Sequence, residues 1–168
     1  PDSIGVSEDA WVNMLSHNLD LQKRVALALE SLSGYKIEVS KIDLFKAAEV
    51  RLKEPRFDLS LSPSETGFGF SQVLPILVEG LSAQNKLICL EQPETHIHPA
   101  FQAKLADFFV NTSFSDKNLK GNNWLIETHS ELIALRVLKK IRNGDIPLDS
   151  VAFYYCDNKS DGSTLKKL

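Results

Sequence analysis

Residues 87–99 read Leu87-Ile88-Cys89-Leu90-Glu91-Gln92-Pro93-Glu94-Thr95-His96-Ile97-His98-Pro99. Four continuous apolar residues open this stretch, which is typical of a buried strand in a parallel sheet. Pro99 suits the first turn of a helix, because its missing N–H is not needed there. Ligands of open α/β sheets bind at the carboxyl ends of the strands. We therefore predict that Glu91, which ends the strand, lies in a ligand crevice, where its carboxylate suits Mg²⁺.

A second apolar run ends in the same way. Residues 124–130 read Trp124-Leu125-Ile126-Glu127-Thr128-His129-Ser130. Ser130 is well placed to cap the next helix, which puts His129 at a strand-to-helix corner. A lone histidine is more often a structural residue, but two strand-end motifs separated by one crossover favour a functional one. We expect Glu91 and His129 to lie at adjacent strand ends and to face one crevice.

The N-terminal third has a different pattern. Residues 7–32 place apolar side chains at helical spacing, and Ser33-Gly34 ends the run, which predicts a helix. Between residues 35 and 61 apolar and polar side chains alternate, with Glu54-Pro55 as a turn. This period of two predicts a small, half-exposed antiparallel sheet.

The remainder of the chain predicts alternating helices and strands. Helices are expected from about residue 70 to 83, over 99–110, and over 130–143, the last closed by Gly144. Residues 151–155 are expected to form a third parallel strand, followed by a turn at 157–162 and a last strand. The predicted fold class is α/β, a parallel sheet with crossover helices plus a small N-terminal helical and antiparallel region. We divide the chain into residues 1–60 and residues 61–168.

The totals describe one ordinary domain. The chain has 168 residues, 43% hydrophobic and 24% charged, as expected for a globular domain. Its net charge of −3 gives no chain-wide footprint for nucleic acid. Cys89 and Cys156 lie in apolar runs, so we expect buried, reduced thiols in a cytoplasmic protein. No membrane span or signal pattern is visible, and a start at Pro1 is typical of an excised fragment or a processed terminus.

Together these segments resemble the heads of ABC-type ATPases, and more closely the SMC-like branch that includes the overcoming-lysogenization-defect (OLD) ATPases. The resemblance covers about residues 60–145. It is carried in order by Gly67-Phe68-Gly69-Phe70-Ser71-Gln72-Val73-Leu74-Pro75-Ile76-Leu77, by residues 87–99 and by residues 124–130. It implies the C-terminal half of a head that binds ATP and Mg²⁺ in a head-to-head dimer, in a DNA-related or phage-defence function.

The resemblance also assigns roles to residues. Glu91 falls where the family has the magnesium-linked Walker B acid, and Gln92 where most members have the catalytic glutamate. His129 matches the switch histidine that senses the γ-phosphate, and residues 94–98 match the D-loop, which reaches across the dimer. The signature, which contacts the partner's nucleotide, matches the segment containing Gly67, Gly69, Ser71 and Gln72. Free backbone N–H groups of a glycine-rich helix start suit contact with phosphate.

Three departures from the family pattern affect the chemistry. No Gly-x-x-x-x-Gly-Lys-Ser/Thr occurs in the sequence, so the phosphate cradle is absent from this chain, and we expect it in a P-loop-containing N-terminal lobe or in the parent chain. Gln92 is neutral and cannot take a proton from water, and losing a general base typically costs about 10²–10⁴ in rate. We therefore expect either that hydrolysis of ATP is slow or that Glu94 acts as the base. The signature lacks the usual Leu-Ser-Gly-Gly order, which leaves the signature serine open.

Other classes of function compete with this one. A metal-dependent hydrolase would use an N/O site made from Glu91, Glu94, His96, His98 and His129. A non-catalytic interaction module would dock through the face of residues 67–77. The helix over 130–143 carries basic side chains that suit DNA phosphates, although a solvated face is the preferred interpretation. These side chains are Arg136, Lys139, Lys140 and Arg142.

Overall fold

The computed structural model describes residues 8–42, 47–114, 121–159 and 162–168. The N-terminal elements are α1 (Glu8–His17), α2 (Leu19–Ser33), β1 (Lys36–Ile42), β2 (Ala47–Glu54) and β3 (Leu59–Leu61). The C-terminal elements are α3 (Phe68–Ser82), β4 (Leu87–Glu91), α4 (Pro99–Ser113), β5 (Asn123–Glu127), α5 (Glu131–Arg142), the 3₁₀ helix η2 (Leu148–Ser150), β6 (Tyr154–Lys159) and β7 (Gly162–Lys167). The fold is mixed α/β, as the sequence predicts.

The long N-terminal helix of the prediction is two helices. Its position 7 and the positions 160–161 of the last predicted turn lie outside the described residues. Asn18 breaks the run: its backbone is extended and its side chain accepts a hydrogen bond from the N–H of Leu21, so it caps α2. Capping of this kind competes with continuing the helix. At the other end Gly34 takes φ of 82° and closes α2, as expected of a glycine in this place.

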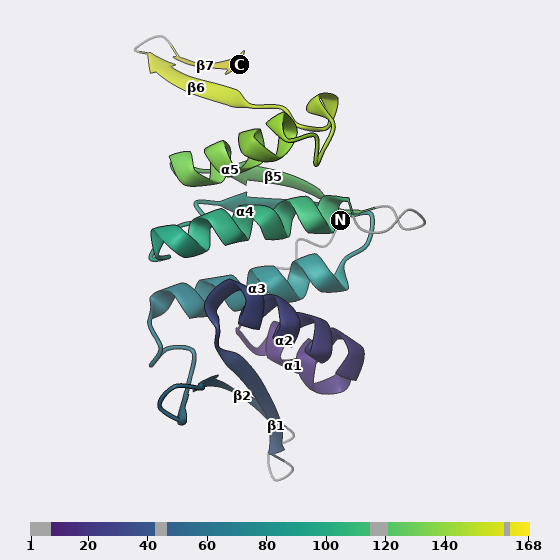
Figure 1. Cartoon of the computed structure of the whole chain (residues 1–168), viewed down its shortest axis with the longest axis vertical. Coiled ribbons are helices and arrows are strands. Elements are labelled where there is room, and N and C mark those ends of the chain that lie inside the picture. The colour runs from purple at the N-terminus through teal and green to yellow at the C-terminus, as the bar shows by residue number, and fades with distance from the viewer. Residues whose placement is uncertain (1–7, 43–46, 115–120, 160–161) are drawn as a thin grey trace.

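One hydrophobic core joins the N-terminal elements to the helices that follow. Figure 1 shows α1 and α2 against α3, with α4 beyond it and the strands β1 and β2 below. Leu15, Leu29, Leu74, Leu77 and Leu105 come from four different helices and are all fully buried. Burying one such side chain contributes about 1.5–3 kcal/mol. Packing therefore crosses position 60, and the division there stays a prediction.

The antiparallel sheet has the order β1–β2–β3, with Val39 opposite Val50 and Leu52 opposite Leu61. This half-exposed sheet confirms the period of two read from the sequence. Leu52 is fully buried against the helices, whereas Phe57 in the following turn is exposed.

The parallel sheet departs from the prediction in size. β4 and β5 pair in parallel, from Leu87 opposite Asn123 to Glu91 opposite Glu127. The third predicted strand does not join them in the described chain. Residues 151–153 are outside any strand, and β6 pairs antiparallel with β7 in a hairpin of its own. Figure 1 shows this hairpin at the far end of the molecule, beyond α5.

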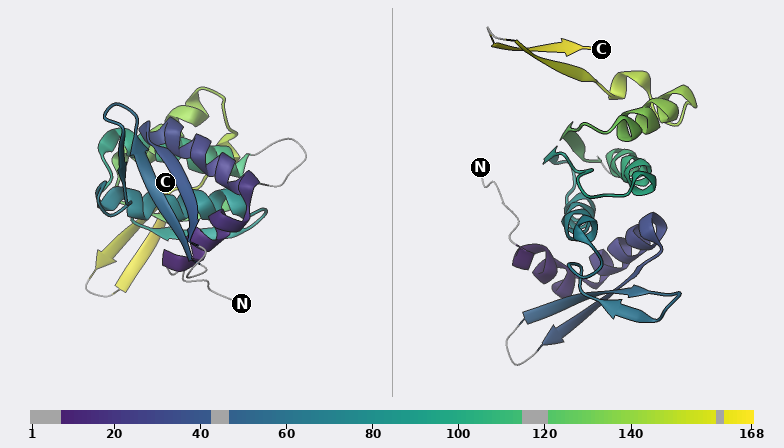
Figure 2. Two further views of the ribbon diagram at one scale, coloured as in Figure 1. Left: turned by 90° about the horizontal axis from the view of Figure 1, so that it is seen from below. Right: turned by 90° about the vertical axis from the view of Figure 1, so that its left-hand side faces the viewer.

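Burial of β4 and β5 also differs from the prediction. Both strands were expected to be buried, but Leu87 is 66% exposed and Leu125 is 61% exposed. The cause is that helices cover one face of this sheet only, as Figure 2 shows. Cys89 points to the open face and Cys156 lies in the outer hairpin, so both thiols are exposed and the expectation of buried cysteines is wrong.

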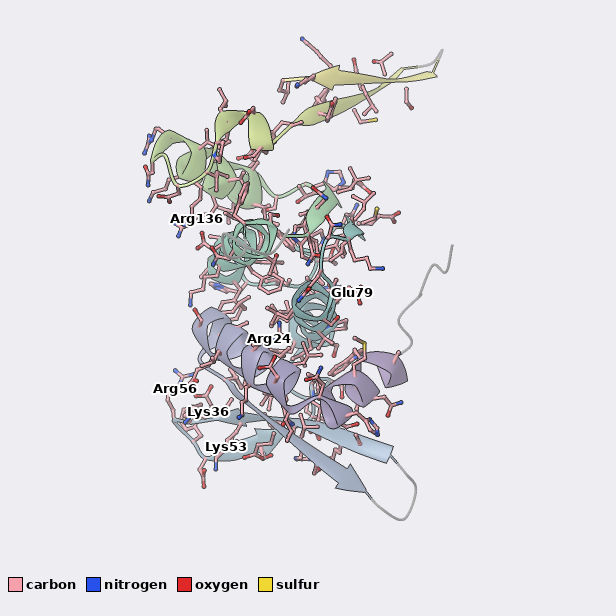
Figure 3. All side chains as sticks on the ribbon, turned by 90° about the vertical axis from the view of Figure 1, so that its right-hand side faces the viewer. Arg24, Lys36, Lys53, Arg56, Glu79 and Arg136 are labelled. Carbon is pink, nitrogen blue, oxygen red and sulfur yellow. The ribbon has the colours of Figure 1, made fainter. Side chains whose placement is uncertain are left out.

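A buried acid anchors the end of β2. The Glu54 side chain is 7% exposed and accepts hydrogen bonds from Arg56 at 2.8 Å from Nε and 3.1 Å from Nη2. These bonds lower the pKa of Glu54 to about 2 from its ordinary 4.5, with a smaller contribution in the same direction from Tyr35. Figure 3 shows Arg56 at this edge of the sheet, near Lys36 and Lys53.

A pH dependence follows from this pair. Because the pKa of Glu54 is lower in the folded chain, its stabilisation is complete above pH 4.5 and is lost as the pH falls toward 2. Arg56→Ala is expected to raise the pKa of Glu54 and so to move acid unfolding to higher pH. Circular dichroism between pH 2 and 7 measures this, with Lys36→Ala as the control for loss of one surface charge. Identical acid profiles for the two variants would contradict the assignment.

Candidate functional site

The site is built on two turns at neighbouring strand ends. We call residues 92–98 the β4 turn and residues 128–130 the β5 turn. The Gln92 N–H donates to the carbonyl of Glu127 at 2.8 Å, so the parallel ladder continues one step past β4. The two turns therefore leave the same edge of the sheet side by side, which confirms the expected placement of Glu91 and His129 at adjacent strand ends.

The β4 turn has an unusual backbone. Gln92 has φ of 45° and His96 has φ of 59°, both in the left-handed region that residues with a Cβ rarely adopt. Such strain costs of order 1–3 kcal/mol per residue and persists only where the surroundings hold it. Thr95 supports the turn from within, since its Oγ1 donates to the Gln92 carbonyl at 2.9 Å.

A cleft of about 450 Å³ opens at the strand ends. It is lined by Gln72, Ile76, Leu90, Glu91, Gln92, Pro93, Thr95 and Glu127. Of the predicted site residues, Glu91, Gln92 and Gln72 thus come together. Glu127 had no predicted role, yet it lies in register with Glu91. Two carboxylates with open access are the donor set that holds Mg²⁺ together with phosphate oxygens.

His129 is not among the residues that line this cleft, so its expected position facing one crevice with Glu91 stays a prediction. Its side chain is 78% exposed, and its Nε2 lies 4.0 Å from Glu127 Oε1. Its backbone N–H donates to Glu94 Oε1 at 2.6 Å. Glu94 Oε2 is buried without a hydrogen-bond partner among the described residues. Glu94 therefore binds the β5 turn through one oxygen, and it is not among the residues lining the cleft.

The glycines of the predicted signature lie elsewhere. Gly67 and Gly69 line a separate cavity of about 200 Å³ with His96, Ile97, His98 and Phe101 of the β4 turn and α4. Gly67 is the N-cap of α3 and has φ of 112°, which only glycine adopts readily. Ser71 is half-buried and lines neither cavity. Of the predicted signature residues, only Gln72 reaches the cleft that contains Glu91.

A close approach joins α3 to the β4 turn. A Cβ at position 69 would lie 2.7 Å from the carbonyl oxygen of His96, so only glycine fits without displacing that turn. The ring of Phe70 continues the contact, 4.8 Å from Tyr35 on one side and 6.4 Å from Phe101 on the other. The start of α3 is thus packed directly on the predicted D-loop.

Gly69→Ala tests this approach. In an open helix start alanine would be stabilising by up to about 1 kcal/mol, but here overpacking is expected to destabilise the chain by about 1–3 kcal/mol. Thermal unfolding gives the first readout and the NMR signals of His96 and Ile97 the second. A more stable variant with unchanged signals would show that the approach is not tight.

Sequence reasoning missed Gln102, which lies on α4 between the two turns. Its Nε2 donates to the Ile97 carbonyl at 2.9 Å, and its Oε1 accepts from Ser130 Oγ at 2.6 Å. Ser130 Oγ also accepts from the Ile133 N–H, as the predicted N-cap of α5. The helical spacing of α4 carries no signal for Gln102, since its partners come from two other segments.

The metal-hydrolase alternative required several acids and histidines around one point. Within residues 8–42, 47–114, 121–159 and 162–168, no group of three or more His, Cys, Asp or Glu side chains is placed to hold a metal ion. Glu94 is occupied with the β5 turn, and His98 caps α4 through Nδ1. The structure therefore does not form the five-residue N/O site of that hypothesis.

The basic residues of α5 are partly neutralised. Arg136 forms a bidentate ion pair with Asp107 of α4, in which Nε donates to Oδ1 at 2.9 Å and Nη2 donates to Oδ2 at 2.7 Å. Figure 3 shows Arg136 directed at that helix. Lys140 lies 3.7 Å from Asp107 and 3.3 Å from Asp145. Lys139 and Arg142 remain exposed on this helix. The pairing ties α5 to α4 and reduces the charge available to a nucleic acid.

Comparison with known proteins identifies the family. A family model described as the AAA ATPase domain matches residues 13–134, which include α3 and both turns. The chain belongs to this AAA ATPase family. Membership indicates use of a nucleotide and a divalent metal. No curated protein matches the sequence significantly. Among the described residues, no helix has the length and apolar character needed to cross a membrane.

Solved structures of SMC heads share the fold of this ATPase domain. One of them is described as structural biochemistry of ATP-driven dimerization and DNA-stimulated activation of SMC ATPases. It matches this chain with a TM-score of 0.67 and 9% sequence identity, and the match covers 96% of this chain and 89% of the SMC chain. An Smc head bound to the C-winged helix domain of ScpA also gives 0.67, at 9% identity. An Smc head domain with an extended coiled coil, bound to the C-terminal domain of ScpA derived from Pyrococcus furiosus, also gives 0.67, at 8% identity.

These alignments differ in how much of the neighbour they cover. The two Smc heads align over 98% and 94% of this chain, which spans only 47% and 37% of their length. The fold of this chain is therefore that of a fragment of an SMC-like, ABC-type ATPase head.

Proposed function

We propose that this chain contributes the Walker B acid, the switch histidine, the D-loop and the signature to an ATPase head whose P-loop lies in a separate lobe. The observation that carries the proposal is the pairing of β4 with β5, which sets Glu91 and the β5 turn of His129 side by side. Family membership supports ATP and Mg²⁺ as the ligands.

Glu91 and Glu127 would hold Mg²⁺ at the cleft, and the ion would offset the charge of the transferred phosphate when bound. Gln92, on the same rim, would orient the attacking water through its amide without taking its proton. The exposed imidazole of His129 would contact the γ-phosphate from the β5 turn. Gly67, Gly69 and Ser71, none of which lines the cleft with Glu91, would serve the nucleotide of a second head.

The open face of the parallel sheet indicates where the P-loop lobe would dock. Leu87, Cys89 and Leu125 are exposed on that face. In the described chain β5 has β4 on one side only, and β6 stands apart in its own hairpin. The free edge of β5 lies beside these exposed leucines, and an unpaired strand edge of this kind is a site for strand addition. A parallel strand of the P-loop lobe beside β5 would pair that edge.

The chain alone is expected to bind Mg-ATP more weakly than about 1 mM, because it has no phosphate cradle and no P-loop lysine. Isothermal titration of the 168-residue chain with Mg-ATP measures this. Adding a purified P-loop lobe should restore binding. Micromolar affinity of the chain by itself would contradict the proposal and point to an unconventional nucleotide site.

A second candidate function is a non-catalytic interaction module, which the exposed leucines of the β4–β5 face also favour. Isothermal titration with Mg-ATP, with and without the P-loop lobe, separates the ATPase head from the interaction module. A lobe that binds the chain tightly, with no gain in Mg-ATP affinity over the lobe alone, would support the module.

The finer assignments extend this proposal. We propose that the assembled head forms an ATP-dependent head-to-head dimer through α3 and the β4 turn. We further propose that the parent protein is an OLD-like, cytoplasmic ATPase with a role in phage defence. The similar SMC ATPase structure, which is described in terms of ATP-driven dimerization and DNA-stimulated activation, supports the proposed dimer. Light scattering of the assembled head with and without ATP measures the dimer, and DNA-stimulated turnover tests the role of Lys139 and Arg142.

A further inference from the structure

Two side chains bridge the turns that carry the proposed site. Glu94 Oε1 accepts from the His129 N–H, and Gln102 links the Ile97 carbonyl to Ser130 Oγ. We propose that Glu94 and Gln102 are positioning residues, which hold the β5 turn on the β4 turn and so set His129 relative to Glu91. This inference rests on the proposed function for its catalytic meaning, but the contact itself belongs to the chain alone.

The Glu94 carboxylate is placed as an anchor. A backbone N–H bonded to a carboxylate is stronger than a neutral pair, and 2.6 Å is short for such a bond. The other oxygen, Oε2, is covered by protein atoms. A general base must reach its water directly or through one other water, whereas neither oxygen of Glu94 lines the cleft. Glu94 therefore acts through His129.

Gln102 uses both ends of its amide. Its carbonyl oxygen accepts from the cap of α5 and its NH₂ donates to the β4 turn. No carboxylate can replace it in both roles, since an ionised carboxylate only accepts. Gln102→Glu would keep an acceptor toward Ser130 and lose the donor toward Ile97.

The need for two bridges follows from the backbone. The β4 turn contains left-handed residues at Gln92 and His96, and strained turns persist only where neighbouring structure holds them. Thr95 bonds within the turn, so it does not fix the turn to β5. Glu94 and Gln102 supply that connection, one from the turn itself and one from α4.

NMR of the 168-residue chain tests the positioning without any nucleotide. In Glu94→Ala the His129 amide proton is expected to move upfield and its hydrogen exchange to accelerate about ten- to a hundredfold, as for loss of a charged hydrogen bond. Glu94→Gln keeps a neutral acceptor and should give a smaller upfield shift. Glu131→Gln is the matched control, because it removes a carboxylate two residues from His129 on an exposed helix start.

Gln102 is tested in the same spectra. Gln102→Glu should move the signals of Ile97 and its neighbours, and Gln102→Ala should move those of Ser130 and His129 as well. An unchanged His129 amide in Glu94→Ala, or an equal change in Glu131→Gln, would overturn the inference even if the chain proves to be part of an ATPase. If Glu94→Ala fails to fold, Glu94→Gln decides: an unshifted His129 amide overturns the inference. Failure of ATP binding by the assembled head would remove the proposed function and leave these contacts standing.

Discussion

Gln92→Glu is expected to raise ATP turnover by the assembled head about ten- to a hundredfold. Gln92 lies on the rim of the cleft beside Glu91, and the resemblance to SMC-like heads implies a catalytic glutamate at this position. An amide orients water but cannot accept its proton, and a general base at this point contributes about 10²–10⁴ in rate. The gain should be in kcat, because the change adds a proton acceptor and leaves the nucleotide contacts in place. Phosphate release at saturating Mg-ATP measures it.

Glu94 is the competing base, and its variants separate the cases. If Glu94 takes the proton, Glu94→Gln abolishes turnover and Gln92→Glu has little effect. The structure favours the opposite result, since Glu94 Oε1 is bonded to the His129 N–H and Oε2 is buried. We expect Glu94→Gln to retain most of the activity. A fully active Glu94→Gln protein that is also unaffected by Gln92→Glu would show that neither residue serves the water.

The arrangement of the two strand ends could be predicted because its causes are local. An apolar run followed by an acid, and a second run followed by a helix cap, each fix where a strand stops. One crossover helix then requires the strands to be parallel. Asn122 and Lys86 close the opposite end of the same pair, where the Lys86 N–H donates to Asn122 Oδ1 at 3.2 Å. The placement of Glu91 beside the β5 turn needs no further information.

Burial could not be predicted in the same way, because it depends on what covers each face. Cys89 and Leu125 lie in apolar runs, but the described chain supplies helices to one face of β4–β5 only. The same cause explains the third strand. Nothing local to residues 151–155 tells whether a partner edge is available, and β6 pairs with β7 instead. The role of Gln102 could not be predicted from the sequence, because its two hydrogen-bond partners belong to two other segments of the chain.

Glu91→Gln is expected to reduce turnover by the assembled head by more than about a hundredfold. A carboxylate that holds Mg²⁺ contributes several kcal/mol to stabilising the charge of phosphoryl transfer, and the amide is a weaker ligand for a hard cation. Gln at this position keeps the size of the side chain and its place at the end of β4. The loss should therefore appear in kcat and in the dependence on Mg²⁺ concentration, with the thermal stability of the chain unchanged.

Glu127→Gln is the companion variant, because Glu127 lies in register with Glu91 and would hold the same ion. Its carboxylate also stands 4.0 Å from His129 Nε2, so part of its role is toward the histidine. We expect a smaller loss than for Glu91→Gln, with a weaker dependence on added Mg²⁺. Equal losses, both rescued by high Mg²⁺, would mean that the two acids contribute equally to holding the ion. A large loss for Glu127→Gln alone would transfer the metal from the end of β4 to the end of β5 and contradict the assignment of Glu91.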